Sequence, residues 1–160
     1  MGLFSRRGPD PEPSDEPAVP DDDDRRPLHP VARELRPQDA ALLERCRAEL
    51  AAEGLDLDSL EAIGAAYDAA VSTHRSGRWR RDEHTPHVER FGVALGEWLT
   101  RHTDLRWTTV SDVFGTDLGL MAPDDDFALV PSNIVSGRWM NGQTGWVPGV
   151  LRHLASLRAR

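Results

Sequence analysis

Two histidines three residues apart suggest metal chemistry in this sequence. His84 and His87 are flanked by Glu83 and Glu89, so imidazole and carboxylate ligands stand close together along the chain. A zinc site takes three or four ligands, and no third His or Cys lies within helical reach. Pro86 between the two histidines favours helix-cap and loop roles for them. We therefore expect no metal site, and the scattered histidines and single cysteine give no reason to expect an organic cofactor.

The aspartate run at residues 124–126 suggests calcium chemistry, because carboxylate oxygens are the preferred ligands of that ion. The run lacks the EF-hand spacing, the interior glycine and the terminal glutamate of a calcium-binding loop. We expect it to form the soluble tip of a hairpin.

The segment from His74 to Arg90 is a basic region in an acidic chain. It carries five arginines against three acidic residues, and Trp79 stands among them. Arginines around a stacking aromatic are typical of proteins that bind single-stranded nucleic acid. The whole chain has a formal net charge of -8, which repels phosphate. We therefore expect a solvated loop between helices, with Trp79 folded onto the core, and no nucleic acid partner.

Four polar residues near predicted turns remain as candidates for catalysis or ligand binding: Asp112, Asp117, Asn133 and Arg138. A carboxylate and a guanidinium, such as Asp112 and Arg138, could bind a substrate together, although such a pair more often clamps a fold. The sequence contains no phosphate-binding loop, nucleophile elbow or dinucleotide fingerprint. It assigns no catalytic residue, and an enzyme of unrecognised type that uses Asp112 and Arg138 is one alternative.

These candidates must be positioned by a single α+β domain at residues 37–160, which follows an acidic, Pro-rich tail at residues 1–36. The tail contains seven of the 12 prolines, and residues 10–24 carry eight acidic residues and no basic one. Such a segment cannot bury enough apolar surface to offset the entropy of ordering. We expect the tail to be disordered and dispensable for folding, while its aspartate run at 21–24 could serve as an acidic binding arm.

Hydrophobic periodicity predicts N-terminal helices, a three-stranded antiparallel meander and C-terminal helices. The predicted helices span about residues 37–54, 58–77, 85–102, 132–139 and 148–157, and the predicted strands 105–110, 116–121 and 127–130. Cys46 lies on the apolar stripe of the first helix, so we expect a small core residue there and not a reactive thiol. Gly92 and Gly96 in the third helix are expected to let another element approach its backbone closely.

Alternation along the strands predicts two different faces of the sheet. The face expected to meet the core carries Leu105, Trp107, Leu118, Leu120, Phe127 and Leu129. The opposite face carries Arg106, Thr108, Asp117, Gly119, Ala128 and Val130. We expect the helix at 58–77 to cover this second face, because its apolar stripe must be buried, and the alternative is a partner docked there. The candidate binding residues are Arg106, Thr108, Asp112, Asp117, Gly119 and Arg138.

An ordered set of residues in the second half of the chain matches a known pattern. The set consists of Phe91, Gly92, Leu95, Gly96, Glu97, Trp107, Asp112, Gly115, Pro131 and Arg138. On these residues, the segment 88–157 resembles a bacterial domain of unknown function, DUF3806. The resemblance implies the same arrangement of helices and strands, and it implies no activity, substrate or cofactor.

The sequence as a whole favours a non-enzymatic protein-binding or regulatory module whose partner is another protein. A module of this kind needs only an exposed sheet face, a groove or an acidic tail. The alternatives are a small-ligand-binding domain and the unrecognised enzyme. The start of the chain does not resemble a signal peptide, no apolar run approaches the ~18 residues of a membrane span, and Cys46 is the only cysteine. We therefore expect a cytoplasmic protein without a membrane partner.

Overall fold

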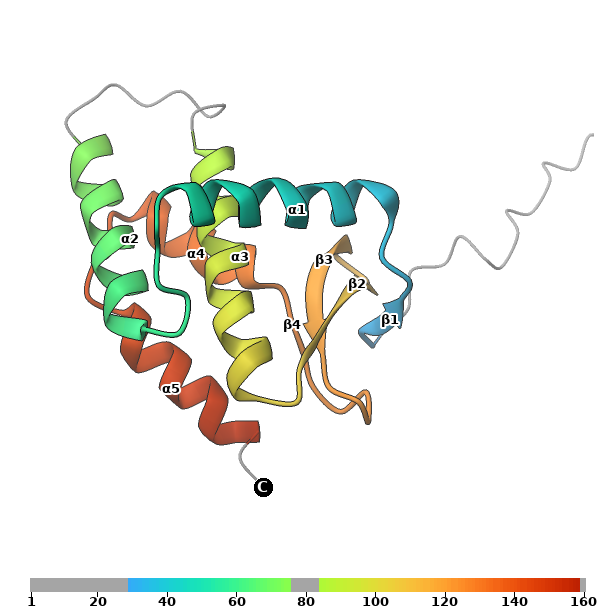
Figure 1. Cartoon of the computed structure of the whole chain (residues 1–160). Helices are drawn as coiled ribbons and strands as arrows, with labels where there is room; N and C mark the ends of the chain where they lie inside the picture. The colour runs from blue at the N-terminus through green and yellow to red at the C-terminus, as the bar shows by residue number, and fades with distance from the viewer. Residues whose placement is uncertain (1–28, 76–83, 159–160) are drawn as a thin grey trace, which may run out of the picture.

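A computed structural model describes residues 29–75 and 84–158, which form an α+β fold of helices and an antiparallel sheet. The predicted fold class is confirmed. In chain order the elements are β1 (Val31–Arg33), α1 (Pro37–Ala52), α2 (Leu60–His74), α3 (Thr85–His102), β2 (Arg106–Asp112), β3 (Gly115–Met121), β4 (Ala128–Leu129), α4 (Pro131–Met140) and α5 (Val147–Arg158) (Figure 1).

The helix boundaries follow from local capping chemistry. Pro37 opens α1, where its missing N–H costs no hydrogen bond, and Gly54 follows the helix with a φ of +66°. Ser59 caps α2 by accepting a hydrogen bond at Oγ from the backbone N–H of Ala62, at 3.1 Å. Pro131 opens α4 and also ends the sheet, because proline cannot donate to a strand ladder. No helix in the described ranges is long and apolar enough to cross a membrane.

The central element is α3, which is buried without interruption from Phe91 to Leu99. It packs against every other helix and against β2. Two close approaches depend on its glycines. A Cβ at Gly92 would lie 3.0 Å from backbone atoms of Ser132, and a Cβ at Gly96 would lie 2.2 Å from the ring of Trp107. The predicted role of these glycines in close packing is confirmed.

The sheet is antiparallel throughout, with the strand order β1-β2-β3-β4. The predicted meander corresponds to β2, β3 and β4, although β4 contains only two residues. Its register places Trp107 opposite Leu120, and Leu120 opposite Leu129, so these side chains share one face. They pack against the helices, as the alternation predicts.

The additional strand, β1, comes from the segment that was predicted to be a disordered tail. Val31 pairs with Ser111 and Arg33 with Thr109, and the Thr108 hydroxyl donates a hydrogen bond to the Arg33 carbonyl at 2.5 Å. Structure therefore begins before residue 37, because three residues of extended chain satisfy backbone groups on the open edge of β2. The prediction of disorder for residues 1–28 falls outside the described residues.

In Figure 1, α2, α3, α4 and α5 lie to the left of the sheet, and α1 runs across the top toward β1. The apolar stripe of α2, which includes Ile63, Tyr67 and Val71, is buried mainly against α3 and α5. The expectation that this helix covers the second sheet face is therefore wrong. The physical reason is that α5 and the Trp139 and Trp146 rings supply the apolar surface that the stripe needs.

Candidate functional site

The predicted binding residues on the sheet do not form one open surface. Arg106 is exposed, whereas the Thr108 hydroxyl is committed to the β1 backbone. Gly119 is buried, and a Cβ there would lie 2.5 Å from Cγ2 of Val110 and 2.9 Å from the Leu129 carbonyl oxygen. Gly119 therefore permits tight packing within the sheet and does not offer an open docking position.

Asp112 and Arg138 lie in different parts of the fold and have different partners. Asp112 Oδ1 accepts hydrogen bonds from the backbone N–H groups of Phe114, at 2.8 Å, and Gly115, at 3.1 Å, and so fixes the β2–β3 turn. Arg138 lies at the end of α4, donates to the Ile134 carbonyl and covers the ring of Trp146 at 4.6 Å. Across the described ranges, no hydrogen bond or ion pair joins Asp112 to Arg138. The geometry gives both residues structural roles.

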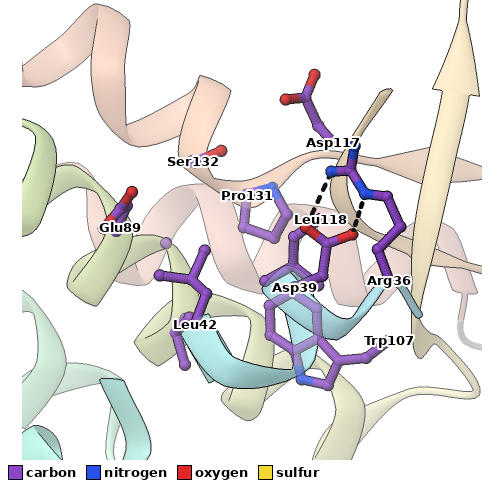
Figure 2. Close-up of a pocket in the computed structure, with 11 residues that line it drawn as sticks. Arg36, Asp39, Leu42, Glu89, Trp107, Asp117, Leu118, Pro131 and Ser132 are labelled. Atoms are coloured by element: carbon purple, nitrogen blue, oxygen red, sulfur yellow. Dashed lines mark hydrogen bonds and ion pairs between the residues drawn. The ribbon is translucent and has the colours of Figure 1, made fainter. Parts of the chain in front are cut away.

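A groove of about 160 Å³ opens between the start of α1, the middle of α3, the sheet and the start of α4. Figure 2 shows the residues that line it. They are Arg36, Asp39, Leu42, Glu89, Gly92, Val93, Trp107, Asp117, Leu118, Pro131 and Ser132. Asp117 is the one predicted binding residue in this set, and the others were not identified as site residues from the sequence.

One wall of the groove is an ion pair at the start of α1. Arg36 donates two hydrogen bonds to Asp39, from Nε to Oδ2 at 2.7 Å and from Nη2 to Oδ1 at 2.9 Å. Asp39 is only 4% exposed and also accepts a hydrogen bond from the Thr109 hydroxyl at 2.6 Å. The hydrogen bonds from Arg36 outweigh burial and lower the pKa of Asp39 below its usual value of 3.8. This arrangement fixes the guanidinium in place and ties α1 to β2.

Trp107 forms the floor of the groove, and a hydrogen bond holds its ring in place. Its indole Nε1 donates a hydrogen bond to Oε1 of Glu97 at 2.9 Å, and the same oxygen accepts from Nη2 of Arg47 at 2.7 Å. Glu97 is buried, so these hydrogen bonds compensate the removal of its charge from water. The floor therefore cannot shift without breaking a buried polar network.

The rim of the groove is acidic. The Glu89 and Asp117 carboxylates lie to either side of Pro131 (Figure 2). Glu89 pairs through Oε2 with Arg45 at 2.6 Å, whereas Asp117 is exposed. The lining residues contribute one cation, Arg36, and three carboxylates, 1 - 3 = -2 in formal charge. The groove therefore favours a positively charged ligand over an anion.

The histidines form a second cluster, between the end of α2 and the start of α3. The rings of His74 and His87 lie 4.0 Å apart, and His87 also stacks on Trp139. Trp139 Nε1 donates a hydrogen bond to Nδ1 of His84 at 3.0 Å. Burial, with nearby His74, Arg90 and His84 adding to it, lowers the pKa of His87 to about 4. The His87 ring therefore packs in its neutral form near pH 7.

Neither the histidines nor other groups are arranged as a metal site in the part of the chain that the structure describes. No set of three or more His, Cys, Asp or Glu side chains there is placed to hold an ion. The aspartate run at 124–126, predicted to be the soluble tip of a hairpin, lies in the exposed turn between β3 and β4. Trp79, predicted to fold onto the core, lies outside the described residues. Of the segment from His74 to Arg90 that was expected to be a loop, residues 85–90 form the start of α3.

Comparison with known proteins identifies the family. The family described as domain of unknown function (DUF3806) matches residues 66–149, more than half of the chain. The chain belongs to the DUF3806 family. The match begins inside α2, earlier than the resemblance at 88–157 indicates, and ends early in α5. No curated protein and no solved structure matches the chain.

The DUF3806 match includes Asp117, the predicted binding residue of the groove, and several groove residues that were not predicted. Glu89, Trp107, Asp117 and Pro131 lie inside the matched residues, whereas Arg36 and Asp39 lie before them. The groove of this chain is therefore completed by a segment outside the DUF3806 match. One sequence signal could have indicated that this segment contributes to a site. It is the Arg-Pro-x-Asp pattern at the start of the first predicted helix, because an Arg and an Asp three residues apart can form an ion pair there.

Proposed function

We propose that this DUF3806 protein is a non-enzymatic module that binds another protein through the β2–β3 hairpin and the neighbouring groove. The observation that carries the proposal is the position of Phe114, which is 89% exposed at the tip of the hairpin. Large aromatic residues are enriched among the residues that dominate binding energy in protein interfaces. Val113 beside it is 40% exposed, and Val31 on the adjoining β1 is 42% exposed. Together they make an apolar end of the sheet that a partner could cover.

The hairpin tip is held in one conformation before any partner arrives. Asp112 accepts two backbone hydrogen bonds within the turn, and the hydroxyls of Ser111 and Thr116 are hydrogen bonded at 3.0 Å just below it. A preorganised aromatic loses little conformational entropy on binding, which favours affinity. β3 links the tip to the groove, because Phe114 precedes this strand and Asp117 lies within it.

The small size of this groove does not suit an organic ligand, although more open hollows of about 350–460 Å³ lie elsewhere on the described residues. Pockets for organic ligands usually measure roughly 300–1,000 Å³, whereas this groove measures about 160 Å³. An enzyme based on Asp112 and Arg138 would need both side chains in one site, and each is engaged elsewhere. We also propose a cytoplasmic location, which the single buried Cys46 supports because no disulfide is needed for the fold.

Affinity capture with matched variants tests the proposed docking surface. Full-length wild-type protein, Phe114→Ala and Met140→Ala would be used as bait in lysate of the source organism, with quantitative mass spectrometry. Met140 is 64% exposed on α4 and serves as the control. We expect a protein that wild type and Met140→Ala retain, that Phe114→Ala loses, and that binds again when purified. Equal capture by all three baits, or no binding between the purified proteins, would contradict the proposal.

A further inference from the structure

We propose that the groove receives one arginine or lysine side chain of the protein partner. The alkyl stem would lie on the apolar floor, and the cationic head would lie beside Asp117 and Glu89 on the rim. This proposal rests on the protein-binding function and specifies the partner chemistry that the groove selects.

The size of the groove matches a single side chain. A cavity of about 150 Å³ holds a molecule the size of benzene, and this groove measures about 160 Å³. A folded cofactor or a nucleotide would not fit in this volume. One side chain presented by a partner would fill it.

The walls of the groove match an alkyl stem. Leu42, Val93, Leu118 and Pro131 line it, and the Trp107 indole forms its floor. Lysine and arginine bury their methylene groups on apolar surfaces of this kind while the charge stays near water. The floor is already fixed by the hydrogen bond from Trp107 to Glu97, so a stem can pack there without ordering the pocket first.

The rim selects a cation over an anion. Arg36 is neutralised by its paired hydrogen bonds to Asp39, so it offers little attraction to an acidic ligand. Within the described ranges Asp117 forms no ion pair, and Glu89 uses one carboxylate oxygen for Arg45. A guanidinium or ammonium group entering the groove would therefore meet the Asp117 carboxylate, which Arg36 attracts without forming an ion pair with it, and the second oxygen of the Glu89 carboxylate. An acidic side chain would instead meet a lining with a formal charge of -2.

Single-residue probes test this pairing directly. Nα-acetyl-arginine amide and Nα-acetyl-lysine amide would be titrated into the ¹⁵N-labelled full chain, and the amide signals of Val93 and Leu118 and the indole signal of Trp107 would be followed. We expect saturable shifts at these positions. The norleucine analogue, which has a stem without a charge, should bind about tenfold more weakly, and the glutamate analogue should not bind.

Two variants assign the binding to the rim. Asp117→Asn should weaken the arginine and lysine probes about fivefold or more, because it removes the carboxylate charge while keeping the side-chain shape. Asp125→Asn is the matched control, since Asp125 is exposed in the β3–β4 turn, does not line the groove and has a positive φ that asparagine tolerates. Its affinity for the probes should stay within about twofold of wild type.

Three results would overturn the proposal: no saturable shift with either cationic probe, equal affinity for the norleucine analogue, or an unchanged affinity in Asp117→Asn. The titration uses only purified protein and residue mimics. It can therefore fail while the capture experiment with Phe114→Ala succeeds, which would leave a docking hairpin without a cation groove. The reverse result would leave a cation groove that does not serve the hairpin partner.

Discussion

The ring of Trp107 occupies the space that a side chain at Gly96 would need. A Cβ at Gly96 would lie 2.2 Å from two atoms of this ring. The ring cannot move away easily, because its Nε1 is hydrogen bonded to buried Glu97. The close approach of α3 and β2 therefore depends on the absence of a side chain at this position.

Gly96→Ala should destabilise the protein by about 2–3 kcal/mol, because overpacking outweighs the gain in helix propensity. Gly137→Ala is the matched control, since Gly137 lies inside α4 and a Cβ there meets nothing within 4 Å. The control should stabilise the protein by about 0.5–1 kcal/mol. Urea denaturation measures the free energy of unfolding of both variants. An equal change in stability at the two sites would show that the Trp107 ring moves aside.

Asp39→Asn should lower the free energy of unfolding by about 1–3 kcal/mol near pH 7, because Arg36 and Thr109 lose a buried charged acceptor. The pKa of Asp39 is lowered in the folded state by its hydrogen bonds to Arg36. Its stabilising contribution is therefore present above pH 3.8, the unfolded value, and is lost as the pH falls through the lower folded-state pKa. Denaturation curves of wild type and variant should converge only in strong acid. A difference that is independent of pH would disprove the charge-based explanation.

His87 should make the protein less stable as the pH falls from about 6.5 toward 4. Burial lowers its folded-state pKa from 6.5 to about 4, so the unfolded chain takes up a proton in this window that the folded chain does not. His87→Phe keeps a ring on Trp139 and removes the titration. Its melting temperature should fall less steeply than that of wild type in thermal scans across this window. His153→Gln, at an exposed position on α5, is the control, and its melting temperature should fall as steeply as that of wild type. Parallel curves for all three proteins would refute the assignment of this pH dependence to His87.

Cys46 should be unreactive in the folded protein. It is buried on α1, and burial raises the pKa of its thiol to about 11, so almost no thiolate is present near pH 8. Ellman's reagent should label the native chain very slowly and the guanidinium-unfolded chain rapidly. Stoichiometric labelling of the native protein within minutes would show that the helix opens or that the thiol is accessible.

The elements that could be predicted from the sequence are those with strong local signals. Pro37 and Thr85 mark helix starts in both the prediction and the structure, and the alternation through Trp107 and Leu120 gives the buried sheet face. Periodicity repeats within a short window of sequence, so a single chain carries enough information for these assignments. The glycines of α3 were predictable for the same reason.

The groove and β1 could not be predicted because they depend on contacts between distant residues. Arg36 donates its backbone N–H to the Thr109 hydroxyl, 73 positions along the chain, and no local pattern encodes that pairing. Proline and acidic residues dominate the composition of the first 36 residues and obscured the short strand at Val31–Arg33. The prediction that α2 covers the second sheet face was wrong. An apolar stripe on a helix indicates that the helix packs against something, but it does not indicate which surface the helix packs on.

The most direct test of the central claim is the affinity of the purified partner for hairpin variants. Isothermal titration calorimetry would compare wild type, Phe114→Ala and Met140→Ala after circular dichroism shows that all three are folded. Phe114 is 89% exposed, so its removal should not change the melting temperature. We predict that Phe114→Ala weakens binding about 30-fold or more, the effect of losing roughly 2 kcal/mol at an interface hot spot, and that Met140→Ala leaves it unchanged. Equal affinities for wild type and Phe114→Ala would contradict the account.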